Sequence, residues 1–283
     1  MTEKIIILDF GSQYTQLIAR AVREANVYCE IIPYHKDVQI TPELKGIILS
    51  GSPSSVNDAM APVTDVRKLA ESKPVLGICY GAQLTAKQFG GKVERSDKRE
   101  YGRATLAVKP GTNSIFKDIP ESSQVWMSHG DTILELPDNF DLLATTGSIP
   151  VAAFQVNNLP NPLFGLQFHP EVYHSEKGKL ILKNFLVEVC SCKQDWTPAH
   201  FITDTVAALK QQIGNKKVIM ALSGGVDSTV AATLISRAIG ANLFGIFVDN
   251  GVLRKNEYNQ VLETYKLLNL NVRGVDAKEH FYT

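Results

Sequence analysis

The sequence predicts an α/β protein with two domains: an open mixed sheet flanked by helices, followed by the first part of a parallel sheet. Three observations support this fold class. Apolar strand-like runs alternate with helix-like runs over residues 5–89, which is typical of a parallel sheet covered by helices. Strand-like runs joined by turns follow over residues 104–168, and the alternation of helix and strand returns after residue 200.

In the first domain, we expect short apolar runs to be strands and segments with helical periodicity to be helices. The expected parallel part has strands at residues 5–9, 27–32, 46–50 and 74–79 and helices at residues 13–25, 63–70 and 82–89. The expected antiparallel extension has strands at residues 104–109, 124–127, 142–145, 151–155 and 163–168, and a closing helix spans residues 180–189.

A short polar stretch around Trp196 predicts a domain boundary, which gives domains of residues 1–195 and 196–283. The second domain is expected to have helices at residues 201–212, 226–239 and 256–268 and strands at residues 217–222, 243–249 and 271–276. So short a parallel sheet leaves edges and helix faces unpaired, and we therefore expect this domain to be truncated.

Composition excludes several classes of protein. Among the 283 residues, basic and acidic side chains are equal in number, so no overall field favours nucleic acid or an anionic membrane. No apolar run approaches the roughly 18 residues that span a bilayer, and the N-terminus lacks the layout of a signal peptide. The four cysteines do not form a disulfide framework, and no second pair supports zinc at Cys190 and Cys192. We expect a cytoplasmic protein without nucleic-acid or membrane partners.

A cysteine lies in the pattern Gly77-Ile78-Cys79-Tyr80-Gly81, between an expected strand and an expected helix. The glycines permit a sharp turn that pushes Cys79 out of the sheet, and the helix N-terminus favours its thiolate. The backbone N–H of Tyr80 can then point at a developing oxyanion. The alternative is a buried apolar cysteine before a helix.

The run His169-Pro170-Glu171 follows the strand expected at residues 163–168. Residues two apart in an extended chain face the same way, so Glu171 can orient the His169 imidazole and stabilise its charged form. A lone histidine at a strand end is usually structural. The nearby glutamate and the separate cysteine elbow favour a nucleophile and its base instead.

Together with the segments Leu49-Ser50-Gly51-Ser52-Pro53 and Ser128-His129-Gly130-Asp131, these motifs resemble the class I (triad) glutamine amidotransferases, in that family's order. The resemblance implies that Cys79 is the nucleophile, His169 the base and Glu171 its orienting carboxylate.

The resemblance also implies how glutamine is held. Gly51 would supply a second oxyanion N–H beside that of Tyr80. The residues implied to bind glutamine are Gln83, Ser128, His129 and Gly130. Asp131 departs from the apolar residue that other members often carry, and its contact stays open. Each of the two polar segments alone can also be an ordinary loop or turn.

A second motif, Ser223-Gly224-Gly225-Val226-Asp227-Ser228, lies between an apolar run and a helix-like run. A glycine-rich turn between strand and helix exposes backbone N–H groups at the positive helix end, which is a phosphate cradle. The motif lacks the Gly-Lys-Ser/Thr of the common P-loop. It resembles the pyrophosphate loop (PP-loop) of enzymes that split ATP into AMP and pyrophosphate. The alternative is a Gly-Gly turn with residues that cap the helix.

The PP-loop resemblance implies roles for single residues. The backbone of Ser223, Gly224, Gly225 and Val226 would bind the β- and γ-phosphates, and Ser228 and Thr229 would add hydroxyl donors. The Asp227 carboxylate would meet the phosphates through Mg²⁺. Val248 and Asp249, at the end of the next strand, can contact adenine or ribose, or can belong to an Asn-Gly turn with a capping Asp.

Both modules in this order resemble the glutamine-hydrolysing GMP synthetases over the whole chain. The resemblance implies glutamine, ATP and XMP as substrates, with Mg²⁺ and no prosthetic group. ATP would adenylate XMP, and ammonia would then displace AMP to give GMP. That family continues past Thr283 into a C-terminal dimerisation domain, which implies a full-length homodimer and a fragment unable to make GMP. The alternatives are an amidotransferase or PP-loop enzyme of another pathway and a catalytically silent binding protein.

Overall fold

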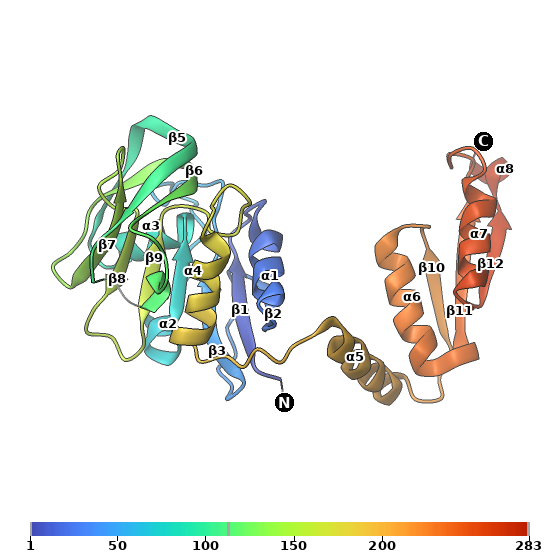
Figure 1. Ribbon diagram of the computed structural model, residues 1–283. Coiled ribbons are helices and arrows are strands. Elements are labelled where there is room, and N and C mark those ends of the chain that lie inside the picture. Colours follow the sequence, from blue (N-terminus) through green and yellow to red (C-terminus); the bar gives the residue numbers. More distant parts are fainter. Residues whose placement is uncertain (1, 112–113, 282–283) are drawn as a thin grey trace. The chain divides into compact units, whose positions relative to one another are not determined.

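The computed structural model describes residues 2–111 and 114–281, and outside residues 96–100 it describes their side chains as well. The chain divides into two compact units, with the boundary between Trp196 and Thr197 (Figure 1). The first unit holds a large mixed sheet and the second a small parallel sheet, which confirms the predicted fold class. Among the described residues, no helix has the length and apolar character that crossing a membrane requires.

Within the described part of the first unit, the strands form one sheet in the order β2-β1-β3-β4-β9-β8-β7-β5-β6. The strands are β1 (Lys4–Asp9), β2 (Tyr28–Pro33), β3 (Leu44–Leu49), β4 (Val75–Ile78), β5 (Lys92–Val108), β6 (Ser122–Glu135), β7 (Phe140–Thr146), β8 (Ala153–Val156) and β9 (Leu163–Leu166). The helices are α1 (Thr15–Glu24), α2 (Val66–Ser72), α3 (Tyr80–Gln88) and α4 (Gly178–Asn184), with a 3₁₀ turn η1 (Ser114–Phe116). The predicted closing helix is α4 continued by a π-helical turn, η2 (Phe185–Val189).

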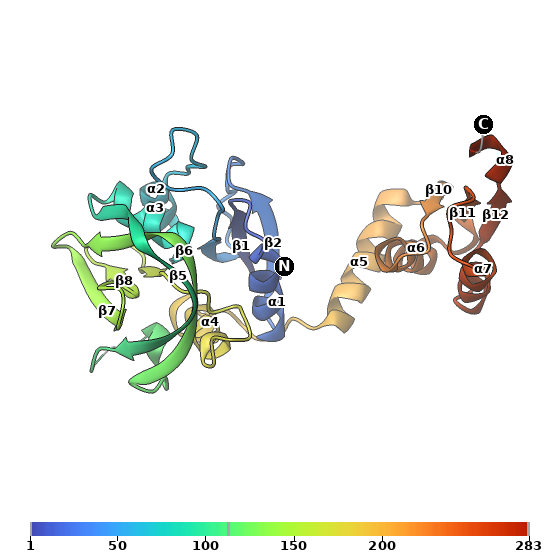
Figure 2. The ribbon, with the colours of Figure 1, turned by 90° about the horizontal axis from the view of Figure 1, so that it is seen from above.

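Alternate residues of the central strands face two separate cores, as expected for a sheet covered on both sides. Ile5 and Ile7 of β1 belong to the core that includes α1 and α4, whereas Ile6 and Leu8 belong to the core that includes α2 and α3. Figure 2 shows α1 and α4 on one face of the sheet and α2 and α3 on the other. Because β1, β3, β4 and β9 are parallel, their carboxyl ends meet at one edge.

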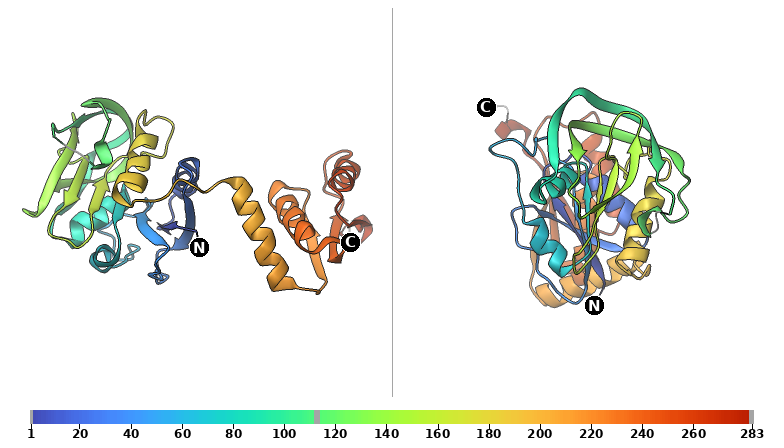
Figure 3. Two further views of the ribbon diagram at one scale, coloured as in Figure 1. Left: turned by 60° about the horizontal axis from the view of Figure 1, so that its bottom comes forward. Right: turned by 90° about the vertical axis from the view of Figure 1, so that its left-hand side faces the viewer.

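The antiparallel part is longer than the sequence predicts. The strands expected at residues 104–109 and 124–127 are parts of β5 and β6, which pair side by side as a long ribbon (Figure 1 and Figure 3). The segment Ser128–Asp131 lies inside β6 and is not a polar turn. Periodicity misses this part of β6 because polar residues occupy buried positions as well as half-buried ones. Strand β9 joins the two parts, since it is parallel to β4 and antiparallel to β8.

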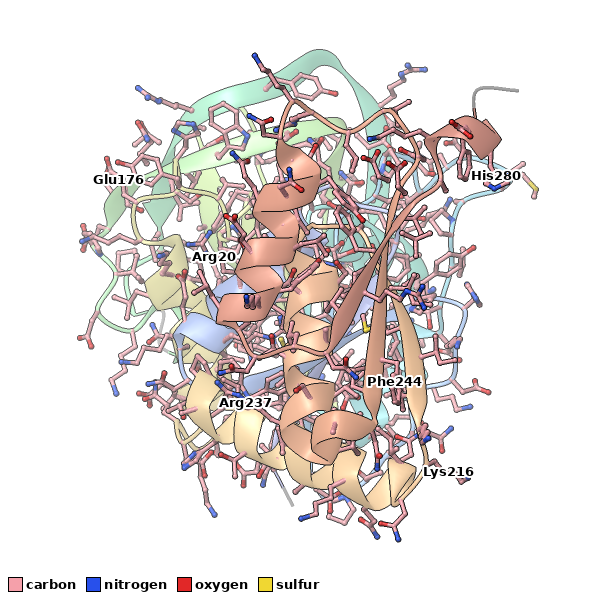
Figure 4. All side chains as sticks on the ribbon, turned by 90° about the vertical axis from the view of Figure 1, so that its right-hand side faces the viewer. Arg20, Glu176, Lys216, Arg237, Phe244 and His280 are labelled. Carbon is pink, nitrogen blue, oxygen red and sulfur yellow. The ribbon has the colours of Figure 1, made fainter. Side chains whose placement is uncertain are left out.

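The second unit has the expected alternation of helix and strand. Its elements are α5 (Pro198–Ile213), β10 (Val218–Leu222), α6 (Val226–Ile239), η3 (Gly240–Asn242), β11 (Leu243–Asp249), α7 (Glu257–Leu267), β12 (Val272–Asp276) and α8 (Lys278–Phe281). The strands are parallel in the order β10-β11-β12. Phe247 and Tyr265 lie in the core of this unit, whereas Phe244, labelled in Figure 4, belongs to the exposed residues of β11.

Candidate functional site

Cys79 lies at the turn between β4 and α3. Its backbone has φ 52° and ψ −102°, a left-handed conformation that costs free energy in a residue other than glycine. The Cys79 N–H donates to the Leu166 carbonyl at 2.7 Å, and the Cys79 Sγ lies 3.7 Å from the Ser128 carbonyl. Contacts from β9 and β6 therefore hold the thiol at the edge where the parallel strands end.

The two glycines beside Cys79 are required by close packing. A Cβ atom on Gly77 would lie 2.6 Å from the carbonyl carbon of Gly81, and one on Gly81 would lie 2.6 Å from the Leu49 Cβ. Neither glycine has a positive φ, so the strained conformation falls on Cys79 itself. The predicted sharp turn at Cys79 is present. Its glycines allow α3 to pack close to the strands, but they do not take up the strained backbone conformation of the turn.

His169 and Glu171 form a buried pair. The His169 Nδ1 lies 2.7 Å from the Glu171 Oε1, and their side chains are 3% and 0% exposed. Burial alone lowers the pKa of His169, but the charges of Glu171 and Cys79 and hydrogen bonds to both outweigh it. The pKa of His169 therefore lies well above its ordinary value of 6.5, which favours an imidazolium beside the thiol.

The pairing of His169 with Glu171 does not come from strand alternation. Strand β9 ends at Leu166, and both residues lie in the turn that follows. This turn is fastened to β6: the His169 N–H donates to the Trp126 carbonyl at 3.0 Å, and the Ser175 hydroxyl donates to the His169 carbonyl at 2.6 Å. Hydrogen bonds to Trp126 of β6 and from Ser175 thus fix the backbone that carries the imidazole.

A cavity of about 780 Å³ opens beside Cys79. The predicted site residues that line it are Gly51, Cys79, Gln83, Ser128, His129, Gly130 and His169. Two others lie outside its lining. The Tyr80 side chain is buried in the core and donates to the Pro62 carbonyl at 2.8 Å, and Glu171 contacts the imidazole of His169.

Gly51 lies next to the base. A Cβ atom at Gly51 would lie 3.4 Å from the His169 Cε1 and 3.2 Å from the Ser12 Oγ. Its neighbour Ser50 is fully buried, accepts from the Phe10 N–H at 3.0 Å and donates to the Gly51 carbonyl at 2.9 Å. The loop after β3 is thereby fixed close to the imidazole.

Asp131 contacts both Ser55 and Gln83. Its carboxylate accepts a hydrogen bond from the Ser55 hydroxyl, and its backbone carbonyl accepts from the Gln83 Nε2 at 2.8 Å. The loop after Gly51 is further held by Asn57, whose Nδ2 donates to the Val93 carbonyl at 2.9 Å. Asp131 therefore joins β6 to both α3 and this loop at the wall of the cavity.

Other residues line the cavity for which the sequence predicted no role. They are Gly11, Ser12, Gln13, Tyr14, Ser54, Ser55, Asn57, Asp58, Arg95 and Tyr101. Ser52, Pro53 and Asp131, which belong to the two polar segments of the resemblance, also line it. The Tyr14 ring meets the His169 ring edge-on, with 4.9 Å between their centroids. The loop after β1 could have been found from its place, because ligands of parallel sheets bind beyond the carboxyl ends of strands.

The predicted nucleotide motif lies between β10 and α6 in the second unit. Gly225 is the N-cap of α6, its N–H donates to the Ser223 Oγ at 3.3 Å, and its carbonyl accepts from the Thr229 hydroxyl at 2.7 Å. The Ser223 and Ser228 hydroxyls lie 3.1 Å apart. Asp227 lies in the first turn of α6. The motif is therefore a turn that links a strand to the N-terminus of a helix, which is the arrangement that a phosphate cradle requires.

The second predicted nucleotide segment ends β11. The Asp249 carboxylate accepts from the Gly251 N–H at 2.9 Å and lies 3.1 Å from the Lys278 ammonium. Val248 is partly exposed on the sheet. The Asn-Gly turn with a capping Asp, which was the alternative interpretation of this segment, is thus present, and Asp249 lies at its start. Among the described residues, no three His, Cys, Asp or Glu side chains gather as a metal would require.

Comparisons with known proteins match both units. A family model described as glutamine amidotransferase class-I matches residues 6–189, and one described as NAD synthase matches residues 199–283. A protein from Cytophaga hutchinsonii named GMP synthase (glutamine-hydrolyzing) is 59% identical over 282 residues, which is 100% of this chain and 55% of that protein. A relative from Bacteroides thetaiotaomicron with the same name, numbered 1, is 57% identical with the same coverage. The chain spans about half the length of the curated relatives it matches.

Solved structures match the first unit. A protein from Thermoplasma acidophilum, described as one component of a GMP synthase, is 33% identical with a TM-score of 0.61, covering 68% of this chain and 95% of that one. A glutamine amidotransferase from Thermotoga maritima is 20% identical with a TM-score of 0.55, covering 67% and 99%, and shows the fold alone.

Proposed function

This chain belongs to the class-I glutamine amidotransferase family, and we propose that its first unit hydrolyses glutamine at Cys79, His169 and Glu171. One observation carries this proposal: a cysteine held in a strained turn faces a cavity together with a buried histidine–glutamate pair. Strain at a nucleophile and a third group that orients the base are the features of a nucleophilic triad.

The proposed reaction has two steps. The Cys79 thiolate attacks the side-chain amide carbon of glutamine. The imidazolium of His169 protonates the amide nitrogen, the C–N bond breaks, and ammonia leaves a thioester on Cys79. Water, deprotonated by His169, then attacks the thioester and releases glutamate and the thiolate. The N–H groups of Gly51 and Tyr80 would receive the oxyanion of both tetrahedral intermediates, each contributing about 3–4 kcal/mol.

The cavity supports the proposed glutamine site. Gln83, Ser128, His129 and Gly130 lie on its wall with Cys79, and we assign them to the α-amino and α-carboxylate groups of the substrate. The contact of the Cys79 Sγ with the Ser128 carbonyl places this segment of β6 next to the nucleophile.

For the whole protein we propose glutamine-dependent synthesis of GMP. The names of the relatives that match all of this chain support XMP as the acceptor of ammonia. The second unit would bind ATP through Ser223 to Thr229, Val248 and Asp249, with Mg²⁺ between Asp227 and the phosphates and no prosthetic group. The donor set is compatible with Mg²⁺, which is usually held by one or two carboxylates and the substrate phosphates.

We also propose a full-length homodimer that acts without nucleic-acid or membrane partners. The four cysteines are free, as in a reducing compartment, which supports the cytoplasm as the place of action.

A glutaminase assay tests the proposed function. Glutamate release is measured with Cys79→Ala and with Cys29→Ala as the control, because Cys29 is also a buried free cysteine but lies outside the cavity. In protein extended to the length of its relatives, with XMP and ATP, only Cys79→Ala is expected to abolish glutamate release while GMP formation from added ammonia persists. Equal rates in the parent and Cys79→Ala would remove Cys79 from the mechanism.

A further inference from the structure

A buried tyrosine hydroxyl contacts the predicted nucleotide loop. Tyr265 of α7 is 2% exposed, and its Oη accepts a hydrogen bond from the Gly224 N–H at 3.1 Å. The Thr229 Oγ1 lies 3.5 Å from the same oxygen. The Tyr265 ring meets the Phe247 ring edge-on, with 6.2 Å between their centroids. Packing in the core of the unit thus fixes the hydroxyl next to two residues of the loop.

The Gly224 peptide is turned toward α7. Gly224 has φ +79°, and a Cβ atom there would lie 3.1 Å from the Val261 Cγ2, another α7 side chain. An N–H that donates to Tyr265 is not directed at a phosphate, which changes the role expected for Gly224. The N–H groups that start α6, from Val226 onward, keep the orientation of a helix N-terminus, which binds anions.

We infer that Tyr265 is a positioning residue of the nucleotide site, whose hydroxyl holds the loop in the conformation that receives the phosphates. This inference rests on the proposed binding of ATP by the second unit. Without the hydroxyl, the Gly224 N–H loses the acceptor that holds its peptide toward α7. Because Gly224 is exposed, water can take the place of that acceptor, and the peptide is then free to reorient. A loop that is no longer preorganised binds its ligand more weakly.

The test compares Tyr265→Phe with Tyr258→Phe. Tyr258 lies on the same helix and stacks on the same Phe247 ring at 5.7 Å, but no hydrogen bond joins its hydroxyl to the described loop residues 223–229. Calorimetry measures the affinity of each variant for inorganic pyrophosphate with Mg²⁺. We expect Tyr265→Phe to bind about tenfold more weakly, equivalent to about 1.4 kcal/mol, and Tyr258→Phe to bind like the parent chain.

Amide hydrogen exchange supplies a second measurement. The Gly224 N–H of the ligand-free parent is expected to be protected, and Tyr265→Phe is expected to expose it. Equal pyrophosphate affinities for the parent and Tyr265→Phe would overturn this inference and leave the proposed nucleotide function standing. An unprotected Gly224 N–H in the parent would do the same, and that measurement does not depend on whether the variant folds. A parent chain that bound no pyrophosphate would overturn the proposed nucleotide function and this inference with it.

Discussion

Replacing Glu171 with glutamine keeps the shape of the side chain and removes its charge. The Glu171 Oε1 lies 2.7 Å from the His169 Nδ1, while the Oε2 is buried without a hydrogen-bond partner among the described residues. Burial alone lowers the pKa of His169, and the charge of Glu171 is the largest influence that raises it. In Glu171→Gln, we therefore expect the pKa of His169 to fall and the thiolate of Cys79 to lose its imidazolium partner.

The size of the effect follows from this hydrogen bond. A hydrogen bond to a charged group contributes about 1.5–3 kcal/mol, and about 1.36 kcal/mol corresponds to a tenfold change in rate. Glu171→Gln is therefore expected to lower kcat for glutamine hydrolysis by about 10- to 150-fold. The KM for glutamine is expected to stay near that of the parent, because Glu171 does not line the cavity.

Two measurements accompany the rate assay. Alkylation of Cys79 by iodoacetamide at neutral pH is expected to slow in Glu171→Gln, because less thiolate forms. Because the pKa of His169 is raised in the folded state, its protonation stabilises the fold fully below pH 6.5, the pKa of the unfolded state. This stabilisation is lost as the pH rises through the folded-state pKa of His169. The variant is thus expected to lose more stability below pH 6.5 than at high pH. Unchanged kcat together with an unchanged alkylation profile would refute the charge argument.

Three further outcomes are expected. Gly81→Ala places a Cβ within 2.6 Å of the Leu49 Cβ, and thermal unfolding is expected to show a loss of about 1–3 kcal/mol; an unchanged Tm would contradict the close packing. Ser175→Ala removes the donor to the His169 carbonyl, so kcat is expected to fall about tenfold or less, and a change in KM alone would argue against a role in positioning the base. Burial raises the pKa of the Cys190 thiol, so mass spectrometry is expected to find it unalkylated in folded protein; rapid labelling would show that it is accessible.

The sequence predicts those parts of the fold that depend on local patterns. Short apolar runs mark the central strands, and the Gly-x-Cys-x-Gly pattern marks the elbow because only glycine fits at Gly77 and Gly81. The same reasoning fails over Ser128–Asp131, where polar residues lie inside β6. The side chains there point into a cavity or find partners elsewhere, so the alternation of apolar and polar residues that predicts a strand is absent.

Contacts between distant segments could not be predicted in the same way. The Trp126 carbonyl of β6 holds His169 although β6 and β9 are not neighbours in the sheet, and Ser55 meets Asp131 from a loop 76 positions earlier in the chain. Single-sequence patterns report the period of a strand or helix, but not which loop lies beside it in space. The grouping of Cys79, His169 and Glu171 was predictable because residue types that carry chemistry lie in recognisable motifs, whereas the residues that hold them were not predictable.

Asp131 shows why residue type and partner have to be considered together. A buried carboxylate is costly unless a donor meets it, and here the Ser55 hydroxyl is that donor. An apolar side chain at position 131 would need no such donor, and the Gln83 Nε2 would keep its acceptor because that is the backbone carbonyl. The contact of Gln83 with the backbone of residue 131 is therefore independent of the side chain at that position, whereas the attachment of the loop after Gly51 depends on it. Variation at this position consequently alters how firmly the loop after Gly51 is held, and it leaves the contact between His169 and Glu171 unchanged.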